Sequence, residues 1–146
     1  MITDLEALGR NVKRAQHRQH RTLEAALAPI GTTVVQWDAM RAVAKNPDAS
    51  AHDLALATFQ TDQSFGTLAN RLEAQGLIVR RPGVGRRIEH ALTEAGERKL
   101  REASTIAETV RETLFAPLGE PDRRQLQRIL DQLLADDTDV ASGRVR

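Results

Sequence analysis

Apolar residues recur at helical intervals through the first 45 positions. Over residues 3–30 they return every three or four positions, which predicts a first helix of about 25 residues. Thr3 and Glu6 have the spacing of a capping box, the reciprocal pairing that starts many helices. A second capping box, Thr33 with Gln36, precedes another helical pattern. We therefore expect two helices in this part of the chain.

Two shorter helices with a brief turn between them are predicted next. Ser50 can cap the first of them and Thr61 the second. Phe65, Leu68 and Leu72 fall on one face of the second helix and are expected to point inward. Two short capped helices joined by a turn of about three residues indicate a helix-turn-helix.

From residue 77 the pattern changes to one that is typical of strands. Residues 77–81 and 87–92 are strand-like, and the segment 82–85 between them is Pro-Gly-Val-Gly, a turn sequence. The pattern predicts a β-hairpin, called here the wing. Thr93 then caps a long helix, and Pro121 occupies a first-turn position of a last one.

The order of elements predicts a mainly α fold with a small β-hairpin wing in a single domain, 1–146. A winged helix-turn-helix is expected over 33–93 and a connecting helix over 94–116. The segments 3–30 and 117–146 are too apolar on one face to stand alone, so we expect them to be dimerisation helices. A helix-turn-helix protein also needs two copies to span two half-sites one DNA turn apart.

The formal net charge is only +1, so net charge alone does not indicate a nucleic-acid partner. The distribution of charge along the chain is more informative. Residues 74–88 hold four arginines and no acid, whereas residues 131–139 hold four aspartates and no base. Arginine is far more frequent than lysine, which suits phosphate contact, although a GC-rich genome would produce the same bias. The basic hairpin directly after a helix-turn-helix favours a DNA-binding protein.

Composition excludes several other classes of function. The chain has no cysteine, no apolar run of roughly 20 residues and no secretory signal pattern, so we expect a cytoplasmic protein that does not enter membranes. No nucleophile, carboxylate-pair or phosphate-loop signature is present, and we expect neither enzymatic activity nor a cofactor. His17 and His20 are spaced for a metal, but without a carboxylate cluster they are interpreted as surface residues, and no metal site is expected.

Several motifs, taken in order, resemble the multiple-antibiotic-resistance-regulator (MarR) family. Residues 61–78 look like the family's recognition helix and its exit, and the wing and the next helix start are similar through Arg80-Arg81-Pro82, Arg86-Arg87 and Leu92-Thr93-Glu94-Ala95-Gly96. The similarity runs from about residue 5 to residue 134. One departure is Gly85, which stands before Arg86 where the family wing commonly has an acid. The resemblance implies a homodimeric transcriptional repressor that binds double-stranded DNA at a palindromic operator. It also implies that a small aromatic or phenolic ligand releases the repressor from its operator.

Candidate DNA-binding residues lie on the outer face of the second helix-turn-helix helix and on the wing. The outer face carries Gln63, Ser64, Thr67, Asn70 and Arg71. Gln63 and Asn70 can bond bidentately to adenine, and the Thr67 methyl can touch thymine. On the wing, Arg86 and Arg87 suit a narrow minor groove, and Arg80 and Arg81 suit phosphates. The alternatives are solvated polar residues and an edge hairpin kept soluble by its charge.

Trp37 and Met40 are the candidate ligand-binding residues, on the helix that follows Thr33. The MarR resemblance places a pocket for small aromatic acids between the dimer helices and the winged domain, which Trp37 would line. A tryptophan on an apolar face is otherwise a core residue.

An alternative function is a winged-helix module that binds protein or ligand without specific DNA recognition, which the glycine at position 85 favours.

Overall fold

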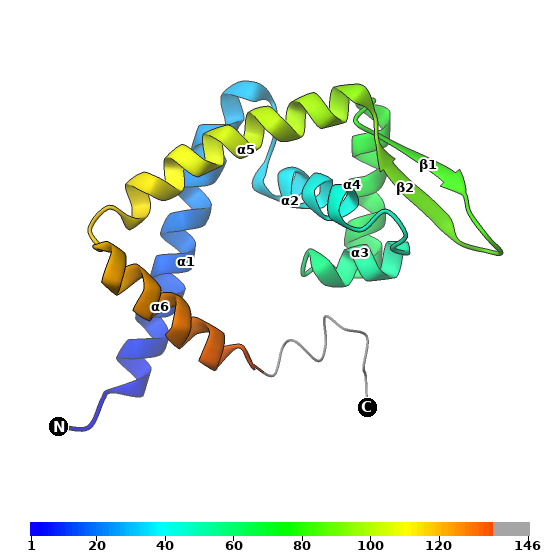
Figure 1. Cartoon of the computed structure of the whole chain (residues 1–146). Coiled ribbons are helices and arrows are strands. Elements are labelled where there is room, and N and C mark those ends of the chain that lie inside the picture. Colours follow the sequence, from blue (N-terminus) through cyan, green and yellow to red (C-terminus); the bar gives the residue numbers. More distant parts are fainter. Residues whose placement is uncertain (136–146) are drawn as a thin grey trace.

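The computed structural model describes residues 1–135, which form helices and one hairpin in the predicted order (Figure 1). The elements are α1 (Leu5–Leu27), a 3-10 helix η1 (Ala28–Ile30), α2 (Val34–Lys45), α3 (Ala51–Ala57), α4 (Asp62–Ala74), β1 (Ile78–Pro82), β2 (Ile88–Leu92), α5 (Glu94–Phe115) and α6 (Glu120–Leu133). The predicted fold class is confirmed. The last part of the expected dimerisation segment 117–146 lies outside the described residues.

Side-chain caps start most of the helices, as their local sequence predicts. Thr33 and Ser50 form complete capping boxes, and Thr61 and Thr93 each accept a hydrogen bond from the third residue of their helix. For α1 the prediction was wrong, because Asp4, not Thr3, is the cap. Its carboxylate accepts from the backbone N–H groups of the second and third helical residues, at 3.1 and 3.2 Å. A charged acceptor also interacts favourably with the positive end of the helix dipole.

The wing is an antiparallel pair in which Ile78 lies opposite Leu92 and Pro82 opposite Ile88. Its first strand begins one residue later than expected, because Leu77 is used at the junction of helices and wing. The Leu77 N–H donates to Leu72 at the end of α4, and its carbonyl accepts from the Thr93 N–H at the start of α5. Gly76, at φ +73°, supplies the left-handed turn that makes this closure possible.

Within residues 1–135, two apolar cores hold the elements together. One joins α2, α3, α4 and β1 beneath the helix-turn-helix, and Leu54, Phe65, Leu72 and Ile78 are almost completely buried in it. Each such side chain contributes roughly 1.5–3 kcal/mol when it is fully buried. The other core joins α1, α2 and α5. The first core therefore sets the position of α4 and the wing, and the second fixes them to the long helices.

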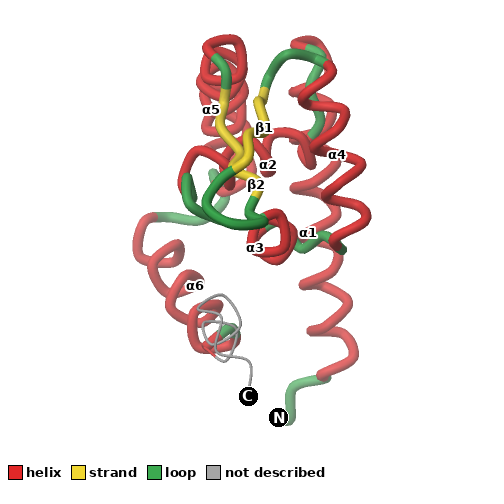
Figure 2. Tube along the Cα trace, turned by 90° about the vertical axis from the view of Figure 1, so that its right-hand side faces the viewer, coloured by secondary structure: helices red, strands yellow, loops and turns green. Residues whose placement is uncertain are grey.

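The N-terminal half of α1 and the whole of α6 project away from both cores (Figures 1 and 2). Leu5, Leu8 and Val12 are exposed on α1, as are Ile129 and Leu133 on α6, and no residue of α6 is buried. The two helices overlap in Figure 1 but stand apart in Figure 2. Within residues 1–135, no helix combines the length and apolar character that crossing a bilayer requires.

Candidate DNA-binding surface

The outer face of α4 presents the predicted base-reading side chains to solvent. Each of them is exposed: Gln63, Ser64, Thr67, Asn70 and Arg71. The inner face is anchored by Phe65, Ala69 and Leu72, which are about 1% exposed. The Thr67 hydroxyl donates to the Gln63 carbonyl at 3.1 Å, so its polar atom is already bonded within the helix. The sequence pattern thus separated the two faces of this helix correctly.

Arg80, on strand β1, is bonded to two side chains of α4. Its Nε and Nη2 atoms donate to the two carboxylate oxygens of Glu73 at 3.2 and 3.0 Å, and Nη2 also donates to Asn70 Oδ1 at 2.6 Å. The hydrogen bond from Arg80 holds the pKa of the Glu73 carboxyl below its ordinary value. Sequence reasoning had assigned Arg80 to a phosphate contact and had given Glu73 no role. This network joins the wing to the recognition helix.

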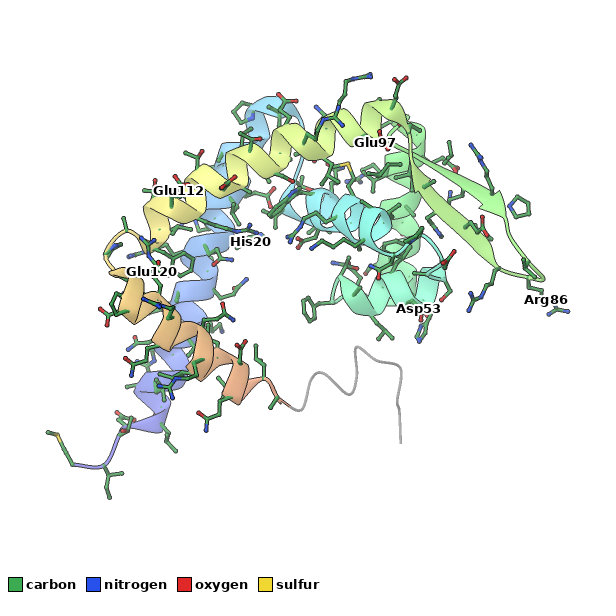
Figure 3. All side chains as sticks on the ribbon, viewed as in Figure 1. His20, Asp53, Arg86, Glu97, Glu112 and Glu120 are labelled. Carbon is green, nitrogen blue, oxygen red and sulfur yellow. The ribbon has the colours of Figure 1, made fainter. Side chains whose placement is uncertain are left out.

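Arg86 and Arg87, at the turn of the wing, point in different directions. Gly83 donates to the Arg87 carbonyl at 2.7 Å, and Gly85 has φ +69°, which only glycine adopts without strain. Arg86 projects from the tip, away from the rest of the molecule (Figure 3). The Arg87 guanidinium instead donates to the backbone carbonyl of Asp48, in the loop between α2 and α3, at 3.3 Å.

A histidine and an aspartate connect α3 to the start of α4. His52 Nδ1 lies 2.8 Å from Asp62 Oδ1, and both side chains are exposed. The hydrogen bond and the negative charge of Asp62 raise the pKa of the His52 imidazole. Sequence reasoning missed this pair, although each residue lies in the first turn of a capped helix, which is a visible signal. The pair links the first turns of α3 and α4 on the solvent side of the helix-turn-helix.

Trp37 lies at the junction of α1, α2 and α5 and is 2% exposed. Its indole N–H donates to Ser104 Oγ at 3.2 Å, and the guanidinium carbons of Arg41 and Arg111 lie 4.6 and 5.0 Å from its ring centroid. Met40 is fully buried. Both candidate ligand residues are therefore packed inside the chain, and their contact with a ligand stays a prediction.

Half-buried Asp38 lies beside this tryptophan. Burial raises the pKa of its carboxyl, and the guanidinium groups of Arg41 and Arg111 oppose that effect. His20 lies 3.4 Å from Glu24, so the histidine that was considered as a metal ligand faces a carboxylate on its own helix. Arg41, which lies against the indole ring, is also 3.5 Å from the Asp38 carboxylate.

The basic residues of α1 line an open hollow of about 810 Å³ that includes Arg10, Lys13, Arg14 and His17. In the single chain these side chains are exposed to solvent. On α6, the Asp131 carboxylate accepts a hydrogen bond from the Gln127 side chain at 2.8 Å.

Residues 30–88 match the model of the MarR family. Among curated proteins, the chain is 28% identical over 116 residues to the HTH-type transcriptional repressor Rv2887 of Mycobacterium tuberculosis, covering 78% of this chain and 84% of that protein. It is 27% identical over 105 residues to the homoprotocatechuate degradative operon repressor of Escherichia coli, covering 70% and 71% respectively.

Solved structures agree with these matches. The M. tuberculosis Rv2887 complex with DNA superimposes with a TM-score of 0.74 at 26% identity, over 86% of this chain and 96% of that one. The same protein with p-aminosalicylic acid gives a TM-score of 0.73 at 27% identity, over 86% and 97%. An E. coli MarR cysteine-to-serine mutant with operator DNA gives 0.82 at 18% identity, over 88% and 94%, a likeness that shows the fold alone.

Proposed function

We propose that this chain is a MarR-family winged-helix protein and that it acts as a homodimeric, sequence-specific DNA-binding regulator of transcription. It represses its target in the cytoplasm and is released by a small aromatic acid. The observation that carries the proposal is the exposed polar face of α4, joined by Arg80 to a wing whose tip presents Arg86. That combination supplies base readers and a cation for the backbone or minor groove on adjoining elements.

The second subunit covers the apolar faces of α1 and α6. Leu5, Leu8 and Val12 on one helix and Ile129 and Leu133 on the other are exposed in the single chain. Their burial is favourable at about 25 cal/mol per Å² of apolar surface. A twofold axis through these helices then places two α4 helices about one turn of DNA apart.

The ligand acts at the junction around Trp37. Rv2887 has been solved with p-aminosalicylic acid and with salicylic acid, and this chain shares its fold. Here two guanidinium groups, from Arg41 and Arg111, lie against the indole ring. A phenolic acid can take the place of one of them on the ring and pair its carboxylate with the displaced guanidinium. Because α2 and α5 link the dimer helices to the winged domain, such binding changes the distance between recognition helices.

The test is binding to the DNA upstream of the chain's own gene across a salt series. Each phosphate neutralised by an arginine releases counterions, so affinity is expected to fall linearly on logarithmic axes as salt rises. Addition of salicylate is expected to weaken the same complex, whereas phenol, which keeps the ring and its hydroxyl but lacks the carboxylate, is the matched control and is expected to have no such effect. No binding at low salt, or affinity that does not change with salt, would reject a phosphate-contacting protein.

A second candidate function is a winged-helix module without specific DNA recognition. It is favoured by Gly85, which removes the acid that the family commonly has at the wing tip. Alanine replacements at Arg86 and Arg87 separate the two functions. Unchanged affinity for the upstream DNA would support the second candidate, and a loss of affinity would support the first.

A further inference from the structure

The contact between Arg80 and Asn70 determines which atoms of the Asn70 amide face outward. A guanidinium has donors only, so the amide atom that lies 2.6 Å from Arg80 Nη2 must be the carbonyl oxygen. The Nδ2 amino group is then the other end of the amide. Because Asn70 is exposed on the outer face of α4, this end is the one available to a bound molecule.

The guanidinium that holds Asn70 is itself held firmly. Nε and Nη2 of Arg80 meet the two oxygens of Glu73 at 3.2 and 3.0 Å, and the Arg80 side chain is 26% exposed. Bidentate, charge-assisted pairs of this kind fix orientation as well as adding energy. On the neighbouring strand, the Cα partner of Arg80 is His90, which is buried against Phe65 of α4. The clamp of Arg80, Glu73 and Asn70 is therefore anchored to both the wing and the recognition helix.

A clamped amide reads DNA differently from a free one. A free asparagine recognises adenine with both ends, since its oxygen accepts from N6 while its nitrogen donates to N7. In this chain the oxygen is already engaged by Arg80, and two N–H donors remain. Guanine is the base that offers two acceptors, N7 and O6, in the major groove.

We propose that Asn70 is a specificity-determining residue that selects guanine in each half-site, and that Arg80 is the positioning residue that gives it this preference. The proposal rests on the proposed function, because it requires α4 to lie in the major groove. It replaces the adenine preference expected of Asn70 from its residue type alone. It also assigns Arg80 to holding a base reader, where sequence reasoning expected it to contact a phosphate.

The experiment measures the base preference of the purified full-length protein at every position of its selected site. Wild-type protein and variants are each used to select duplexes from a randomised pool, and single-base competitors then quantify the preference. Asn70→Ala identifies the position, because the base preference that it abolishes is the one that Asn70 reads. At that position, wild-type protein is expected to prefer guanine over adenine roughly tenfold.

Two variants test the clamp at that position. Arg80→Leu frees the amide to turn, and adenine is expected to bind as well as guanine or better. Asn70→Asp keeps an oxygen toward Arg80 but presents an acceptor to the groove, so the guanine preference is expected to disappear. Because Asn70 is exposed and this change conserves its shape, the second variant carries the test if Arg80→Leu fails to fold.

Arg81→Leu is the matched control for the loss of a wing arginine. Arg81 is the next residue of the same strand and is exposed, so its removal is expected to weaken binding equally for all bases at the Asn70 position. If wild-type protein selects no consensus, the proposed function fails. If wild-type protein selects an inverted repeat with adenine at the Asn70 position, the clamp inference is overturned while the function stands. The same conclusion follows if Arg80→Leu and Asn70→Asp prefer guanine at that position as strongly as wild-type protein does.

Discussion

Replacing Gly96 with alanine is expected to damage the junction between the wing and α5. A Cβ built on Gly96 would lie 2.0 Å from the Leu77 carbonyl oxygen, and separations below 3.0 Å essentially never occur. That same oxygen accepts from the Thr93 N–H at 3.0 Å, and the Thr93 hydroxyl donates to the Gly76 carbonyl at 2.6 Å. To admit the methyl group, the two backbone segments must move apart by about 1 Å, which is the difference between the 2.0 Å separation and the 3.0 Å limit.

The cost can be worked from these contacts. Forcing an extra group into a packed site costs roughly 1–3 kcal/mol. Weakening the two hydrogen bonds at Thr93 adds roughly 0.5–1.5 kcal/mol for each. Alanine recovers at most about 1 kcal/mol through its higher helix propensity. We expect Gly96→Ala to lower the free energy of unfolding by about 3 kcal/mol, with the overpacking as the largest contribution.

Urea unfolding at a fixed protein concentration measures this change, with Gly66→Ala as the matched control. Gly66 lies within α4, and a Cβ there would meet nothing within 4 Å. The same substitution is therefore expected to stabilise the protein by roughly 0.5–1 kcal/mol at that position. If Gly96→Ala proves neutral, or stabilises the protein as Gly66→Ala does, the reasoning about the junction is refuted.

Three further predictions follow from single residues. Phe59 has φ 57°, a left-handed conformation that strains every residue with a Cβ, and its side chain is 95% exposed. Phe59→Gly is therefore expected to stabilise the protein by roughly 0.5–1 kcal/mol in urea unfolding, whereas Phe59→Ala, which keeps the Cβ, is not. Equal effects of the two substitutions would contradict backbone strain. Burial, and secondly the charge of Arg80, hold the pKa of His90 below its ordinary value of 6.5, so the unfolded chain takes up a proton before the folded chain does. The free energy of unfolding is therefore expected to fall as pH drops below 6.5. In His90→Leu the slope of the free energy of unfolding against pH should be flatter, and an unchanged slope would exclude this cause. Arg86→Ala is expected to weaken DNA binding more than Arg87→Ala, because Arg87 is bonded to the Asp48 carbonyl; the reverse order in a titration would contradict this.

The fold was predictable because most of its signals are local. A capping box such as Thr33 with Gln36 is written within four residues, and the inward face of α4 follows from the spacing of Phe65 and Leu72. The misplaced cap of α1 shows the limit of such reasoning. Thr3 and Asp4 are both good caps, and only the backbone decides which of them begins the helix.

The arrangement of the candidate site was less predictable, because its contacts join residues that are distant in sequence. Arg87 meets the Asp48 carbonyl across 39 positions, and Trp37 meets Ser104 across 67. Arg80 and Asn70 are ten positions apart, but they meet only because the turn at Gly76 brings β1 back along α4. Residue types can nominate these side chains, whereas the fold determines which of their atoms are already engaged.

The most direct test of the whole account is to capture the fragments of the host genome that the protein binds and to read their sequences. Two subunits related by a twofold axis predict inverted repeats whose half-site centres lie about one helical turn, roughly 10 base pairs, apart. Fragments that share only a single half-site, a direct repeat or no common sequence would contradict a symmetric dimer that reads DNA through α4.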